Sequence, residues 1–234
     1  MAGRKSKRHP HDRTHRTYRE EKRMTNSFTM TRVDAKRLAQ IALSAASKDD
    51  VTPVICGALL TVSNGALRTT STDRYRVHTA LIDIEGKSED HEFIISRSSL
   101  EWLDKNVGTF GSFQAHRQRV TITTNLDALN ITVRASDLPE AESVSWSGRT
   151  TKGNFPPVIR LIEKARESEP ISAEASFRLE YLAKAKVLSH LGDAPLIRFT
   201  VSENPNKPGP VYFAFSSAGK VYAEAIIQPN LNLS

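Results

Sequence analysis

The segment Gly57–Ala80, GALLTVSNGALRTTSTDRYRVHTA, decides the fold of this chain. Asn64–Gly65 lies between two runs rich in aliphatic and β-branched residues, and an Asn-Gly pair is the strongest short-range signal for a two-residue hairpin turn. A third run of the same kind follows. The segment and its flanks therefore predict three consecutive antiparallel strands, a meander, over Val54–Val62, Ala66–Thr72 and Tyr75–Ile84.

A strand and a helix precede this meander. Phe28–Val33 predicts the strand, and Asp34–Ser47 predicts the helix, with Asp34 as its N-cap. Apolar residues recur at helical spacing on one side of this helix, at Leu38, Ile41, Ala42 and Ala45. One strand, one amphipathic helix and one meander thus form a module.

The module recurs twice. In the second copy, the first strand is His91–Ile95, and the helix runs from Ser98, in a capping box with Glu101, to Gly108. Its three further strands are Ser112–His116, Arg119–Thr124 and Ala128–Ala135. In the third copy, the first strand is Ala175–Phe177 and the helix is Leu179–Leu191, stopped by Gly192. Its three further strands are Leu196–Val201, Val211–Phe215 and Val221–Ile227. Such repeats predict an α+β fold in which helices cover one face of antiparallel sheets.

The composition divides the chain into four parts. Residues 1–26 form a basic tail, 27–137 a complete domain of two modules, 138–170 a connector, and 171–234 half a domain with one module. The connector is rich in proline and glutamate, and only Val158–Ala165 within it predicts a helix.

The net charge of +7 is concentrated in the tail. Residues 1–23 hold nine Lys and Arg against three Asp and Glu, whereas the rest of the chain holds 24 basic and 23 acidic residues. Such a tail is typical of disordered segments that bind DNA or RNA through phosphate charge without reading sequence. The alternative is that translation starts at Met24 or Met30.

Composition also excludes several classes of protein. No apolar run approaches the roughly 18 residues of a membrane span, and no hydrophobic stretch follows the charged N-terminus as in a secretory signal. The single cysteine, Cys56, excludes an internal disulfide framework and a cysteine-based zinc site. We therefore expect a reducing, cytoplasmic setting.

The sequence contains no catalytic constellation. It lacks a glycine-rich phosphate loop, a paired-histidine metal spacing and a nucleophile elbow. We expect the scattered histidines, His78, His91, His116 and His190, to be exposed. Cys56 is expected to be a buried, inert thiol in a strand. The sequence thus predicts no enzyme, no catalytic residue, no metal site and no cofactor.

Four segments, in the correct order, resemble the bacterial β sliding clamp of DNA polymerase III. Thr72–Val77 (TDRYRV) is similar to the Thr-Asp-x-x-Arg-hydrophobic signature of its middle domain, and Asn154–Ile162 (NFPPVIRLI) to the connector that follows. SFRLEYLAKAKVLSHLG (176–192) resembles the strand and helix of the last domain, and AEAIIQPNL (223–231) its C-terminal strand. The resemblance covers roughly residues 28–233.

The resemblance implies a DNA-clamp-like fold, in a form truncated relative to the family. Clamps of this family have six modules per chain and rings of twelve, whereas this chain has three, so a ring of that size needs four chains. The chain also has Gln228, Pro229 and Asn230 where the family has a Met-Pro-Met-like strand. We expect a homo-oligomer, with a dimer or a trimer as alternatives to the tetramer.

The resemblance further implies a pocket between the last two domains for peptide motifs of polymerases and of the clamp loader. Apolar walls with a few arginines suit a peptide with hydrophobic anchors. The matching positions are Ile55, Thr72, Arg74, Tyr75, Arg76, Val77, Pro156, Arg160, Leu161, Arg178, Tyr181, Ile227, Gln228 and Pro229, with Pro208 and Pro210 as poorer matches. The alternative is that Ile55, Val77, Leu161 and Ile227 are core residues only.

The helices line the DNA pore in this family, so DNA contacts are expected from basic residues on their polar faces. The candidates are Arg37, Lys48, Arg97, Lys184 and Lys186. A sliding protein needs diffuse phosphate contacts and no base readout. The expected partners are double-stranded DNA, bound without sequence specificity, a DNA polymerase and a clamp loader, with the protein at the nucleoid during replication.

The function implied is that of a processivity factor, which encircles DNA and tethers a polymerase at high effective concentration. Two alternatives stay open at this point. The first is a clamp-derived decoy that binds clamp partners without encircling DNA. The second is a DNA-binding regulator that uses its basic tail.

Overall fold

The structure is a computed structural model and describes residues 25–86, 88–112, 115–173, 175–190, 192–202, 204 and 207–230. Residues 1–24 of the predicted basic tail, 1–26, lie outside this part, whereas Thr25 and Asn26 belong to the first strand, so the body begins two residues earlier than predicted. No helix among the described residues is long and apolar enough to cross a membrane.

The first two modules form one unit, residues 25–149, which we call the first unit. The first module contains β1 (Thr25–Thr31), α2 (Arg32–Ala45), β2 (Ala58–Ser63), β3 (Ala66–Thr72) and β4 (Arg76–Ile82). The second contains β5 (His91–Ile95), α3 (Arg97–Asn106), β6 (Arg119–Asn125), β7 (Ala128–Arg134) and β8 (Ser143–Arg149). The Asn64–Gly65 hairpin turn is confirmed, because both residues have positive φ, as a type I′ turn requires.

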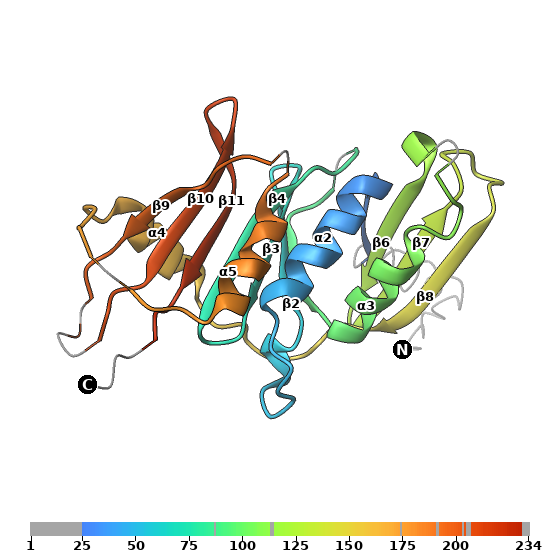
Figure 1. Cartoon of the computed structure of the whole chain (residues 1–234). Helices are drawn as coiled ribbons and strands as arrows, with labels where there is room; N and C mark the ends of the chain where they lie inside the picture. Colours follow the sequence, from blue (N-terminus) through green and yellow to red (C-terminus); the bar gives the residue numbers. More distant parts are fainter. Residues whose placement is uncertain are drawn as a thin grey trace, which may run out of the picture.

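The two modules exchange their first strands. β1 of the first module pairs with β6 of the second, and β5 of the second module pairs with β2 of the first. The sheets therefore have the orders β1-β6-β7-β8 and β5-β2-β3-β4 within this unit. α2 and α3 lie side by side on the sheets (Figure 1) and cover a core that includes Leu38, Leu60 and Ile122.

The third module contains α5 (Leu179–Ala185), a 3-10 turn (Lys186–Leu188), β9 (Leu196–Phe199), β10 (Val211–Ser217) and β11 (Lys220–Ile227). We call residues 171–230 the C-terminal module. β11 pairs with β4 of the first unit, so one seven-stranded sheet, β5-β2-β3-β4-β11-β10-β9, crosses both regions. The α+β class and the clamp-like arrangement of modules are confirmed.

One helix departs from the expected single helical face. α4 (Ile159–Glu167) belongs to the predicted connector and packs on the face of the sheet opposite to α5 (Figure 1). Its Ile162 and Ala165 contact Tyr212, Ala214 and Ile226 in a second, smaller core. The connector is therefore part of the folded body.

The helix starts differ from the predicted N-caps. α2 begins two residues early because the Thr31 hydroxyl, not Asp34, caps it, accepting a hydrogen bond from the Asp34 N–H at 3.2 Å. α3 likewise begins after Ser96, whose hydroxyl accepts from the Ser99 N–H, instead of at Ser98. In both cases a hydroxyl further upstream reaches the third residue of the helix.

Three predicted strand assignments are wrong. Pro53–Ile55 forms a 3-10 turn, so β2 begins only at Ala58. Ala115–Arg117 is also a 3-10 turn, where the sequence predicted a strand over Ser112–His116. Ala175–Phe177 is not a paired strand. Conversely, β8 lies in the predicted connector and completes the first sheet beside β7.

Candidate functional site

The turn between β3 and β4 is built by the Thr-Asp pair of TDRYR. The Thr72 hydroxyl donates to the Arg76 carbonyl (2.8 Å) and accepts from the Arg74 N–H (3.2 Å). One Asp73 carboxylate oxygen accepts from the N–H groups of Tyr75 and Arg76, both at 3.1 Å. Arg74 takes positive φ (77°) and Tyr75 projects outward, 59% exposed. Thr72 and Asp73 thus hold the turn that presents Arg74 and Tyr75.

Arg76 links this turn to the C-terminal module. Its guanidinium is buried, forms an ion pair with Asp73 (3.0 Å), and lies over the Tyr181 ring of α5 at 4.5 Å. Tyr75 stacks on the same ring, with centroids 6.5 Å apart. Arg178 approaches it at 5.9 Å. Tyr181 is therefore the anchor around which the two regions meet.

The end of β11 closes the site from a third side. The Gln228 N–H donates to the Tyr75 carbonyl (2.8 Å), and its side-chain amide donates to the Pro208 carbonyl (2.8 Å). The Asn230 N–H donates to the Ser176 carbonyl at 2.7 Å. These bonds fix the chain after Ile227 against the turn and against the start of α5.

Buried Glu224 fixes α4 to the face of the sheet opposite to α5. Arg166 forms two hydrogen bonds to the Glu224 carboxylate, at 2.8 and 2.9 Å, and Tyr212 donates a third at 2.7 Å. The hydrogen bonds that Arg166 donates to Glu224 raise the pKa of Arg166, and burial raises the pKa of Tyr212 to about 12. A paired buried carboxylate of this kind orients α4 and so positions Leu161 at the groove.

These elements enclose a groove of about 740 Å³. Nine predicted pocket residues line it: Arg74, Tyr75, Arg76, Val77, Leu161, Arg178, Tyr181, Gln228 and Pro229. Pro208 and Pro210 line it too. Sequence reasoning missed lining residues of three other segments, namely Lys164, Ala165 and Ser168 of α4 and its end, Thr200–Ser202, Asn204 and Lys207 before β10, and Ile226 and Asn230. The α4 spacing of three and four residues from Leu161 was the available signal.

Five predicted pocket residues do not line the groove. Ile55 and Ile227 are buried in the structure, as the core alternative held for them. Thr72 supports the turn from behind. Pro156 lines a different cavity of about 560 Å³ beside β5, and Arg160 is an exposed residue of α4 outside the groove.

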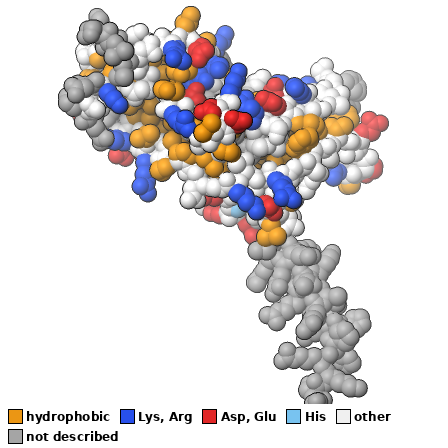
Figure 2. Space-filling view, turned by 90° about the horizontal axis from the view of Figure 1, so that it is seen from below, with side chains coloured by type: hydrophobic (Ala, Val, Ile, Leu, Met, Phe, Trp, Pro, Cys, Tyr) orange, Lys and Arg blue, Asp and Glu red, His pale blue; other side chains and the backbone are white. Residues whose placement is uncertain are grey.

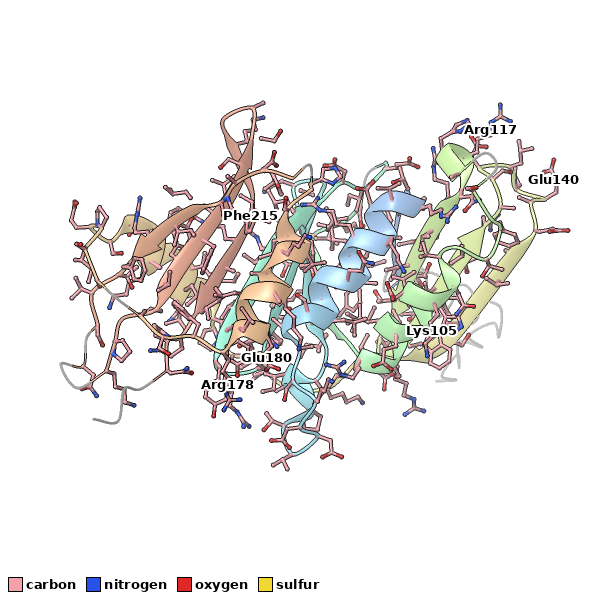
Figure 3. All side chains as sticks on the ribbon, in the orientation of Figure 1. Lys105, Arg117, Glu140, Arg178, Glu180 and Phe215 are labelled. Atoms are coloured by element: carbon pink, nitrogen blue, oxygen red, sulfur yellow. The ribbon has the colours of Figure 1, made fainter. Side chains whose placement is uncertain are left out.

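The groove combines an apolar floor with a basic rim. Val77, Ala165 and Ile226 form its floor, and half-exposed Leu161 and Tyr75 extend it toward solvent. The view in Figure 2 shows this mixture of hydrophobic side chains between Lys and Arg side chains on the molecular surface. Figure 3 places Arg178 and Glu180 at the first turn of α5. Such a site suits a short peptide with apolar side chains and a negative charge.

Comparison with known proteins identifies the fold. Residues 30–134 match the family model of the DNA polymerase III beta subunit, central domain. The structure superposes on the beta subunit from Streptococcus pyogenes DNA polymerase (TM-score 0.62, 15% identity, 86% of this chain and 65% of that one). It also superposes on the DNA polymerase sliding clamp from Pseudomonas aeruginosa (TM-score 0.61, 16% identity, 88% and 66%). The chain has the fold of a β sliding clamp.

Three further facts define this comparison. The chain spans slightly less than two thirds of the length of those clamp structures. The family match begins at residue 30, near the end of β1, and stops at the end of β7, so it omits most of β1 and all of β8. A search of curated proteins gives no match.

The predicted DNA contacts lie in the layer formed by α2, α3 and α5. Lys48, Lys184 and Lys186 are exposed there, and so is Lys105 of α3 (Figure 3). The two predicted arginines are instead engaged within the protein. Arg97 donates to the carbonyls of Ala46 and Ser47, at the end of α2.

The side chain of Arg37 in α2 lies against β4 and the C-terminal module. It donates to the Leu81 carbonyl at 3.2 Å and lies over the Tyr222 ring at 5.0 Å. Burial lowers its pKa. Its position in the sequence could not show this, because the part of α2 that carries Arg37 borders β4 and the C-terminal module.

Two further expectations are corrected. His78 is fully buried under α2, where it contacts the Ser44 hydroxyl at 2.6 Å, and burial lowers its pKa to about 3. Cys56 lies in the turn before β2, only partly buried, and contacts the Asp49 carbonyl at 3.0 Å. No group of three metal-ligating side chains occurs within the described ranges.

Proposed function

We propose that the chain is a non-enzymatic clamp that surrounds double-stranded DNA and holds a DNA polymerase through a short peptide bound in the groove. The clamp fold and the central-domain match support a clamp protein. The observation that carries the proposal is the groove itself, because nine residues predicted from separate segments meet there.

The chemistry of the groove favours a particular peptide. The apolar floor and the side chains of Leu161 and Tyr75 would receive leucine and phenylalanine side chains, which are typical anchors at small interfaces. Arg74, Arg178 and Lys207 would attract acidic residues beside those anchors. The amide groups of Gln228 and Asn230 donate within the protein, so their side-chain carbonyl oxygens would accept hydrogen bonds from the N–H groups of an extended peptide. The expected dissociation constant is about 1 μM, or about −8 kcal/mol.

The helix layer would face DNA. α2, α3 and α5 with its 3-10 turn carry seven Lys and Arg against four Asp and Glu. Arg37 and Arg97 contact protein, and Lys36 pairs with Asp104 at 2.8 Å, so few cations are left for phosphates. A weakly positive surface suits a protein that moves along DNA, because each phosphate contact adds to salt-dependent, sequence-independent affinity.

The test is peptide binding by the intact chain. A fluorescent peptide with a glutamine, two leucines and a phenylalanine is titrated against the wild type and against Leu161→Glu, which places a carboxylate on the groove wall. We expect at least tenfold weaker binding. Arg160→Glu is the control, because it places a carboxylate next to Leu161 but outside the groove, and it changes the net charge by two units against one for Leu161→Glu. This control should bind within twofold of the wild type. Equal affinity of the wild type and Leu161→Glu would contradict the proposal.

A further inference from the structure

The C-terminal module is the only described module that does not exchange strands with another. In the first unit, each module gives its first strand to the other: β1 to β6 and β5 to β2. This exchange covers the outer edge of the first meander strand in both modules. The corresponding edge in the C-terminal module is that of β9.

Both halves of such an exchange are unused in this module. Ala175–Phe177 precedes α5 as β1 precedes α2, and exposure alternates along it, yet it belongs to no ladder. The outer edge of β9 meets one isolated bridge, from Ile171 to Phe199. The rest of the edge, Leu196–Arg198, pairs with no described strand except β10. The first segment of this module thus forms no ladder, although the Ser176 carbonyl accepts a hydrogen bond from the Asn230 N–H at 2.7 Å, and β9 has an open acceptor edge.

Exposed apolar side chains mark the same side. Ile197 faces the helix side of the sheet, because it lies opposite Phe213, and it is 52% exposed. In the first unit, Val120 of β6, which holds the same place in its ladder, is completely buried, as are the other helix-side residues Ile122 of β6 and Leu60 of β2. Leu179 and Leu182 of α5 are also exposed. On the helix side of the sheet, Figure 1 shows α2 next to α5 and no described helix beyond α5, since α4 lies on the opposite face.

We propose that the C-terminal modules of two copies pair about a two-fold axis and rebuild a two-module unit between chains. Each copy gives its residues 176–178 to the open edge Leu196–Arg198 of the other, so the bridge between Ile171 and Phe199 stays in place. A module with both a free strand and a free edge is self-complementary, which an isologous contact requires. In the first unit, each module covers the other with one strand, one helix and apolar side chains. A second copy would cover the β9 edge and the exposed side of α5 in the same way. Two chains joined in this way hold six modules.

The first unit fixes the register of the new ladder. The N-cap residue Thr31 pairs with Arg119, the first residue of β6, and Met30 pairs with Val120. By the same rule the N-cap residue Arg178 lies opposite Leu196 of the other copy, and Phe177 lies opposite Ile197. Phe177 and Ile197 then share the helix side, as Met30 and Val120 do.

Disulfide trapping tests this register. In a Cys56→Ser background, Arg178→Cys protein is mixed with Leu196→Cys protein under mild oxidation. A link between the two variants can only join different chains, so we expect a product of twice the 26.0 kDa chain mass. Each variant alone should give at least fivefold less, because its own cysteines lie at opposite ends of the interface. Arg178→Cys mixed with Leu138→Cys is the control, since Leu138 is exposed on the first unit.

Solution mass gives a second measurement. We expect the wild type to be at least dimeric at micromolar concentration, and Ile197→Lys to weaken self-association at least tenfold, because charge on an edge opposes strand pairing. Leu138→Lys should behave as the wild type. A monomeric wild type without the cross-link overturns the proposal. So does self-association that survives Ile197→Lys but disappears when residues 1–24 are removed. Peptide binding in the groove is measured separately, so its failure would leave this result unchanged.

Discussion

The first unit and the C-terminal module are built from the same module but differ in how much of their core is covered. Leu60 of β2 is covered by Phe93 of β5, whereas Ile197 of β9 has β10 on one side and an open edge on the other. The difference shows that a single module cannot bury its hydrophobic core by itself. Its helix covers one part of the sheet, and the remainder needs a strand and a helix from a second module. The predictions below measure that difference.

The largest effect is expected from paired truncations at Leu60 and Ile197. Leu60→Ala removes a completely buried side chain and should lower the free energy of unfolding by about 2–5 kcal/mol. Ile197→Ala removes a half-exposed one and should cost about 1 kcal/mol or less in the monomer. Urea unfolding of both variants at submicromolar concentration measures the difference. Equal losses would mean that the two modules are equally covered.

Acid should weaken the first unit through His78. Its pKa is lowered to about 3 in the folded protein, so the unfolded chain takes up a proton at a pH where the folded chain does not. Stability should therefore fall as pH drops from about 6.5 toward 3, by about 1.4 kcal/mol per pH unit. Both tryptophans, Trp102 and Trp146, lie in the first unit, so tryptophan fluorescence follows its unfolding.

His78→Gln is the matching variant. Glutamine does not titrate, so the difference in stability between variant and wild type should lose its dependence on pH in this range. A wild type whose acid sensitivity equals that of His78→Gln would show that other groups dominate.

Alkali should weaken the C-terminal module through Tyr212, with a smaller effect. The folded protein keeps this phenol protonated up to about pH 12, whereas the unfolded chain releases the proton near its ordinary pKa of about 10. Stability should therefore fall as pH rises from about 10 to 12, by about 1 kcal/mol after allowance for solvent screening. Circular dichroism in the near ultraviolet compares Tyr212→Phe with the wild type, and only the wild type should show this added loss.

The sequence predicted most of the secondary structure where a local rule decides it. The Asn64–Gly65 turn needs positive φ at two successive residues, and the helices show apolar residues at regular spacing. β8 was missed because SVSWSGR carries little hydrophobicity and half of its side chains face solvent. Its partner β7 supplies the pairing, and no local signal of β8 replaces it.

The site shows the same limit. The residues of the TDRYR turn were found through the resemblance to the clamp signature, which is readable because its residues are contiguous in the sequence. The surroundings of Arg37, Arg97 and His78 come from elements far away in the sequence. Arg37 contacts the Leu81 carbonyl and Tyr222, Arg97 contacts the end of α2, and His78 packs under α2. A helical pattern tells which side is polar, but it does not tell what lies next to that side.

The ladder between β4 and β11 makes the two regions mechanically one piece. Five consecutive residue pairs, from Ala80–Ala223 to Arg76–Ile227, join them by backbone hydrogen bonds. Bending at this joint would break several of those bonds together, so the curvature of the chain is set by the twist of a single sheet. An assembly of such chains would behave as stiff arcs joined by softer seams. Force applied to it would open a seam between chains before it distorted any single chain.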